Sequence, residues 1–174
     1  SLMDFRSKTN PNKFNIFVSA KEAGLNIGIL SSLIQAGCLP NYNSSRSLLV
    51  LEAQSFNLLT DREKRLVLEI ANEYDYKILD IIAKCKEGLI SSDGKRLMSE
   101  SRFETFKVKY LKYKDIYLQN KNHEKFANWF FETKLLGYSY SHDLKSVFND
   151  SEVIFNSLNF YEDNFVRGKF IGVV

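Results

Sequence analysis

The residues in this sequence best suited to chemistry are those that could hold a phosphate group, beginning with the segment from Asn26 to Gly37. Asn26 is a good N-cap, because its side-chain oxygen can accept a hydrogen bond from an amide of the first helical turn. Gly37 suits the position after a helix, because glycine adopts the left-handed conformation without steric cost. A compact helix entered through a glycine-containing turn can present backbone amides to a phosphate. The same segment, with Leu30, Leu33 and Ile34 at helical spacing, can equally be an ordinary packed helix.

A second group of candidate phosphate ligands lies between Lys95 and Lys125, where nine basic residues face four acidic ones. The net positive charge of residues 95–125 is larger than the net charge of +3 for the whole chain. The helix predicted here carries an aromatic stripe made of Phe106, Tyr110, Tyr113 and Tyr117. Lys107 and Lys114 fall off that stripe and are therefore expected to face solvent. They form either a solvated helix face or a patch that binds phosphates in a salt-dependent way.

The sequence carries none of the common catalytic or metal-binding patterns. It has no phosphate-cradling glycine loop and no nucleophile elbow of the form GxSxG. His123 and His142 stand apart from any cysteine or paired carboxylate at ligand spacing. Cys38 and Cys85 fit buried free thiols better than a disulfide framework. We therefore expect no catalytic residue, no metal and no cofactor in this chain itself.

Composition is that of an ordinary soluble domain of 174 residues, with 44% hydrophobic and 26% charged residues. No apolar run reaches the roughly 20 residues that a membrane-spanning helix needs. The start of the chain lacks a signal-peptide pattern, and Ser1-Leu2 before Met3 resembles an expression scar. These features favour a cytoplasmic protein without a membrane partner. The charge permits nucleic-acid binding without requiring it.

Capping signals predict an all-α body that ends in a short β strand. The predicted helix starts are Ser44 or Ser45, a capping box from Thr60 to Glu63, Asp75, a second capping box from Ser101 to Glu104, and Asn120 or Asn122. Gly88 is predicted to end the helix that Asp75 starts, and Gly137 the helix that begins at Asn120 or Asn122. Residues 89–97 contain Asp93-Gly94 and are predicted to form an exposed loop. The final FVRGKFIGVV is rich in apolar and β-branched residues, which favours a strand.

The segment LNIGILSSLIQAGCLPNYNSSRSLL resembles a sequence motif of the bacterial replicative DNA polymerase III alpha subunit, the C-family of polymerases. The matching residues are Asn26, Leu30, Leu33, Ile34, Gly37 and Arg46, whereas Ile27 and Gly28 replace a mostly basic pair. A second segment, ETKLLGYSYSHDL, is similar to a later landmark of that family through Glu132, Leu136, Gly137, Ser141, His142 and Leu144. The C-terminal FVRGKFIGVV is similar to the first strand of the OB-fold that follows it.

This resemblance implies a helix-hairpin-helix region that holds double-stranded DNA through phosphates, without base readout. It places the turn at Asn26, Ile27 and Gly28, with Lys21 and Arg46 as neighbouring contacts. The family's catalytic aspartates lie upstream of this region, and the parent polymerase would use Mg²⁺ and dNTPs. The expected organisation is an N-terminal arm (1–13), a helix-hairpin-helix-like segment (14–60), a helical domain (61–163) and the start of a truncated OB-fold (164–174).

The alternative function is a helical protein-interaction module that docks a replisome partner such as the sliding clamp. The family binds its clamp through a short peptide containing glutamine, and Gln54, Phe56 and Leu58 have suitable types. Phe56 and Leu58 also fit positions in a helical core. A third possibility, a free-standing enzyme, would need a cleft with convergent carboxylates. A hairpin before Asn26 whose amides face solvent beside Lys21 and Arg46 would support the DNA hypothesis, and a buried turn would contradict it.

Overall fold

The computed structural model describes residues 12–40, 42, 44–90, 94, 96–148, 153–155 and 169–170. These residues are mostly helical, as predicted. The chain divides into two compact units, with the boundary between Asn122 and His123. Each unit is described separately below.

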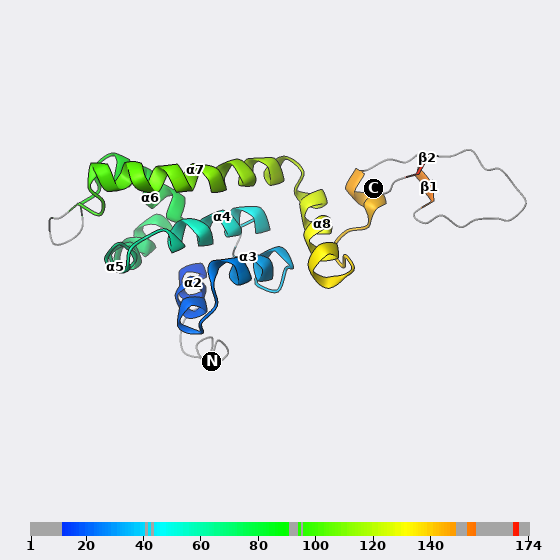
Figure 1. Ribbon diagram of the computed structural model, residues 1–174, viewed down its shortest axis with the longest axis horizontal. Coiled ribbons are helices and arrows are strands. Elements are labelled where there is room, and N and C mark those ends of the chain that lie inside the picture. The colour runs from blue at the N-terminus through cyan, green and yellow to red at the C-terminus, as the bar shows by residue number, and fades with distance from the viewer. Residues whose placement is uncertain are drawn as a thin grey trace, which may run out of the picture. The chain divides into compact units, whose positions relative to one another are not determined.

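The N-terminal unit is built around helix α4 (Figure 1). Its elements are α2 (Lys13–Glu22), α3 (Ile27–Gln35), α4 (Arg46–Asn57), α5 (Asp61–Ile70), the 3-10 helix η1 (Ala71–Tyr74), α6 (Ile78–Lys86) and α7 (Glu100–Asn122). Helix α4 packs against α2, α3, α6 and α7, and it lies between α3 and α7 in Figure 1. The first two helices therefore cover one side of α4, whereas the long α7 covers another.

Aromatic side chains form the centre of the core. The Phe14 and Phe17 rings from α2 lie 5.6 Å and 5.7 Å from the Phe56 ring of α4, measured between centroids. Phe106 of α7 is buried, and the Tyr110 ring lies 5.8 Å from it. The stripe predicted on α7 thus begins in the core, and Tyr110 packs against the core only in part. Burial of these large aromatic surfaces contributes to the stability of the unit.

Most of the predicted helix ends are confirmed. The Asn26 side chain accepts from the Ile29 amide at 2.9 Å, and Gly37 has a φ of +73° just after α3. Ser45 caps α4 by accepting from the amide of Leu48 at 3.2 Å. The capping box at α5 is complete, because Thr60 and Glu63 each accept from the other's amide, at distances of 3.3 Å and 2.7 Å. Gly88 and Gly137 follow α6 and α8 (Glu124–Leu136) with positive φ.

Three predicted starts are wrong by a few residues. Asp75 does not cap α6; it adopts a left-handed conformation after η1, and α6 begins after Lys77 without a side-chain cap. The side chain at the start of helix α7 that accepts an amide hydrogen bond is Ser99, two residues before the predicted cap Ser101. Its hydroxyl accepts from the Arg102 amide at 3.3 Å, and α7 begins at Glu100. Helix α8 begins after His123 rather than at Asn120 or Asn122, because α7 continues through both asparagines.

The C-terminal unit contains α8, α9 (Leu144–Phe148), β1 (Val153–Phe155) and β2 (Lys169–Phe170). The two short strands pair in parallel. Glu132 is fully buried, and its Oε2 accepts from the Ser139 hydroxyl and from the amides of Tyr140 and Ser141. Helical spacing predicts an inward face on α8 made of Phe126, Trp129, Phe130, Thr133 and Leu136. This prediction is only partly correct, because Phe130 and Leu136 are exposed. Most of residues 149–174 lie outside the described residues, so the start of an OB-fold stays a prediction.

Candidate phosphate-binding turn and adjoining pocket

The turn between α2 and α3 faces solvent. Gly24 ends α2 with a φ of +77°, and no atom lies within 4 Å of the position that a Cβ would occupy. The Leu25 amide donates to the Ala20 carbonyl at 2.9 Å, which closes the end of α2. Gly24 and Asn26 are both exposed. Sequence reasoning did not delimit α2, although an N-cap at Asn12 and a glycine stop were readable signals.

The first turn of α3 offers two backbone amides to solvent. The Asn26 side chain occupies the Ile29 amide, whereas the amides of Ile27 and Gly28 donate to no group within the described residues. A Cβ at position 28 would lie 3.1 Å from the Asn26 Oδ1. Glycine at this position therefore leaves the capping carboxamide room. Unpaired amides at a helix N-terminus are suited to contact a phosphate oxygen.

Lys21 lies in the last turn of α2, close to this turn. Its Nζ is 2.7 Å from Oδ1 of Asp61, the first residue of α5. Both side chains are mostly exposed, so the ion pair is at the surface. The hydrogen bond and charge of Lys21 lower the pKa of the Asp61 carboxyl. The structure thus brings Lys21, Asn26, Ile27 and Gly28 together on one side of the unit.

The other predicted DNA contacts lie elsewhere. Arg46 donates from Nη1 to the Gln35 carbonyl at 3.3 Å, at the far end of α3 from Asn26. Nine helical residues span about 13 Å, so Arg46 does not reach the turn by this route. Lys107 and Lys114 are exposed on α7, and Lys107 lies 3.5 Å from Glu104. Because α4 lies between α3 and α7 in Figure 1, these lysines belong to a different surface.

The segment predicted to bind the sliding clamp is part of the folded core. Residues Gln54 and Phe56 lie within α4, and Leu58 directly follows it. Phe56 is only 3% exposed, and Leu58 packs against the core. An extended recognition peptide would have to expose both apolar side chains. The folded segment does not, in agreement with the core interpretation of these two residues.

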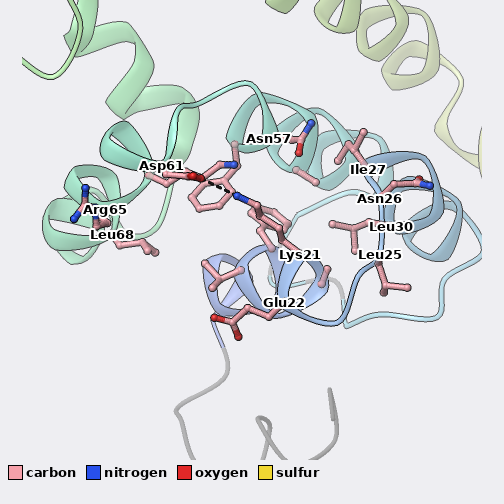
Figure 2. Close-up of a pocket in the computed structure, with 16 residues that line it drawn as sticks. Lys21, Glu22, Leu25, Asn26, Ile27, Leu30, Asn57, Asp61, Arg65 and Leu68 are labelled. Carbon is pink, nitrogen blue, oxygen red and sulfur yellow. Dashed lines mark hydrogen bonds and ion pairs between the residues drawn. The ribbon is translucent and has the colours of Figure 1, made fainter.

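A pocket of about 640 Å³ opens beside the turn, among α2, α3, α4 and α5 (Figure 2). Its lining is mostly apolar and includes Phe17, Leu25, Ile27, Leu30 and Phe56. Figure 2 shows the Lys21–Asp61 ion pair across it. Lys64 lies at the pocket with its Nζ 5.8 Å from the centroid of the Phe56 ring. Burial lowers the pKa of Lys64, and the nearby positive charge of Lys21 lowers it further.

This pocket could not be predicted from the sequence, because it forms only when the helix pair α2–α3 packs beside the pair α4–α5. Within the described residues, no three His, Cys, Asp or Glu side chains are grouped so as to hold a metal ion. No helix among the described residues is long and apolar enough to span a membrane.

Searches of protein-family models, curated proteins and solved structures found no match to this chain. The resemblance to the polymerase III alpha subunit therefore depends on the residues of the three matching sequence segments alone.

Proposed function

We propose that residues 13–122 hold duplex DNA through phosphate contacts, without reading bases. The observation that carries the proposal is the solvent-facing turn between α2 and α3, with two unpaired amides beside an exposed lysine. Backbone amides and lysines bind phosphate oxygens regardless of the base sequence. This geometry meets part of the expectation for DNA binding, because the turn is not buried, whereas Arg46 lies at the other end of α3.

Lys21 is already paired with Asp61, and this pair shapes how DNA would bind. A phosphate that approaches the turn has to compete with the Asp61 carboxylate for the ammonium group of Lys21. Exposed ion pairs contribute little to stability, so this exchange costs little free energy. The contact is therefore weak and salt-sensitive, as expected for a segment that supports DNA rather than selects a sequence.

The lysines of α7 extend the basic surface of this unit to a second side. Lys107, Lys109, Lys112 and Lys114 are all exposed, whereas Arg102 is used inside the fold. One straight duplex would contact either the turn or α7 most closely, because α4 separates the two. We place the primary contact at the turn, because two unpaired amides lie at the start of α3 and Lys21 lies in the last turn of α2.

The parent protein follows from the resemblance alone. We propose that this unit belongs to a replicative polymerase alpha subunit, whose palm would bind Mg²⁺ and dNTPs outside this segment. DNA would then pass from the palm across the α2–α3 turn.

Fluorescence anisotropy with a short labelled duplex tests the DNA proposal. We expect binding at low salt, equal affinity for unrelated sequences, and a linear fall of log affinity with log salt. Absence of binding at high micromolar protein in low salt would exclude a DNA-holding role for the isolated chain.

A protein-interaction function is the second candidate, and the surface of α7 favours it. Val108, Leu111 and Leu118 are exposed and fall on one side of the helix at helical spacing. Exposed apolar residues in a row are typical of a docking surface. A pull-down with a sliding clamp, comparing wild type with Val108→Ser/Leu118→Ser, would test this surface. If wild type is captured and the double variant is not, the α7 surface binds the clamp. If the clamp does not capture wild type, the clamp is excluded as the partner.

A further inference from the structure

We propose that the pocket among α2, α3, α4 and α5 binds a small organic anion that combines an apolar body with one anionic head group. This function goes beyond DNA holding and does not depend on it. The proposal is based on the apolar floor of the pocket and on the two lysines at its rim, of which Lys21 is paired with Asp61.

The floor of the pocket is a preformed apolar surface. Phe17, Ala20, Leu30, Ala53 and Phe56 line it, and each is at most 5% exposed in the fold. They come from α2, α3 and α4, and both α2 and α3 pack on α4, so the floor is part of the core. The volume of about 640 Å³ is within the range of sites that bind small organic ligands. An apolar body is therefore the larger part of a suitable ligand.

The charges at the rim favour an anion over a neutral or cationic ligand. The charged lining residues are Lys21, Glu22, Asp61, Lys64 and Arg65. Lys21 and Lys64 lie close enough that the charge of Lys21 lowers the pKa of the Lys64 ammonium group, and the Asp61 carboxylate contacts Lys21. The lining thus carries three cations and two carboxylates, and an anionic head group beside Lys64 would balance the remaining positive charge.

The position of Lys64 joins the apolar floor to the charged rim. Its Nζ lies over the Phe56 ring at 5.8 Å from the centroid, and the side chain is half-buried. A ligand that contacts the floor would place its head group near this amine. Partly buried charge-assisted hydrogen bonds are stronger than exposed ones. A carboxylate and a phosphate are both anionic hydrogen-bond acceptors and suit this amine equally. The competition experiment below distinguishes the two head groups.

Two matched dyes test the proposal on the full chain: 1-anilinonaphthalene-8-sulfonate, which is anionic, and N-phenyl-1-naphthylamine, which is neutral. We expect the anionic dye to bind one site about tenfold more tightly than the neutral dye. Lys64→Gln should remove that preference and leave the neutral dye unaffected. Arg62→Gln is the control, because Arg62 is a neighbouring cation of α5 that contacts the Arg96 carbonyl instead of the pocket.

A second variant, Asn57→Trp, tests the location. Asn57 is exposed and lines the pocket, so a large ring there should block both dyes without changing the thermal unfolding curve. Displacement of the anionic dye by decanoate or by decyl phosphate would then identify the preferred head group. Equal affinity for the two dyes, or an unchanged preference in Lys64→Gln, would overturn the proposal. DNA affinity measured on Lys64→Gln separates this outcome from failure of the DNA proposal, since the turn is intact in that variant.

Discussion

Arg102 and Glu63 join the start of α7 to the start of α5 through two hydrogen bonds. Arg102 donates from Nε to Oε1 at 3.0 Å and from Nη2 to Oε2 at 2.9 Å, and the same Nη2 also donates to the Leu58 carbonyl. Glu63 is buried and at the same time accepts from the Thr60 amide in the capping box. One carboxylate thus serves a helix cap and an interhelical ion pair.

The first prediction concerns this pair. Arg102→Met should lower the free energy of unfolding by about 2–4 kcal/mol, because it leaves a buried carboxylate without its partner. Lys109→Met, an exposed position on the same helix, should change it by less than about 0.5 kcal/mol. Urea denaturation measures both variants. Equal stabilities for the two variants would mean that the ion pair contributes nothing to the fold.

The second prediction concerns the Asn26 cap. Asn26→Ala should destabilise the N-terminal unit by about 1 kcal/mol, because the Ile29 amide loses its acceptor. Asn26→Asp keeps an acceptor oxygen and should restore most of that stability. Thermal unfolding followed by circular dichroism tests the pair of variants. A fully stable alanine variant would show that the cap is not needed to hold α3.

The third prediction separates the two thiols. Cys85 is buried, and burial raises its pKa to about 12, with the charge of Glu63 as a smaller cause. Cys38 is exposed. We expect one thiol to react rapidly with Ellman's reagent in the folded protein, and the second only after unfolding. Cys38→Ser should remove the rapid phase, and survival of that phase would contradict the structure.

The fourth prediction concerns the buried pair Lys13–Glu52, whose Nζ–Oε1 distance is 2.6 Å. Burial raises the pKa of Glu52 above its ordinary 4.5, although the hydrogen bond from Lys13 opposes the shift. The folded state therefore binds the proton of Glu52 more tightly than the unfolded state does. Its contribution to stability is present below pH 4.5 and is lost as the pH rises through the folded-state pKa.

Relative to Glu52→Gln, wild type should thus become less stable as the pH increases from 4.5 to neutrality. Denaturation curves of both proteins at several pH values measure the difference. A wild type that gains stability over the variant in this interval would show that attraction to Lys13, rather than burial, controls the carboxyl.

Features set by neighbouring residues could be predicted from the sequence. Asn26, Ser45 and the Thr60–Glu63 box cap helices as expected, because a cap depends on a side chain and an amide only three residues away. Asp75 was predicted as a cap but lies in a left-handed turn, since the 3-10 helix before it shifts the chain. That short helix leaves no clear signal in the sequence.

Features set by distant residues could not be predicted in the same way. Arg102 was counted among the cations of a basic surface, whereas tertiary packing pairs it with Glu63, 39 residues earlier. Arg46 was expected near the turn, but the direction of α3 takes it to the opposite helix end. The pocket combines residues from four helices, and only their packing brings Lys21 near Lys64.

The most direct test of the DNA proposal compares the salt dependence of duplex binding in Lys21→Gln and Lys84→Gln. Lys84 is a suitable control, because it is also an exposed lysine in an ion pair, with Glu87 at 2.6 Å on α6. We predict that Lys21→Gln weakens binding and reduces the slope of log affinity against log salt by about 1, while Lys84→Gln leaves both unchanged. Identical slopes for wild type and Lys21→Gln would contradict the assignment of the α2–α3 turn as the phosphate contact.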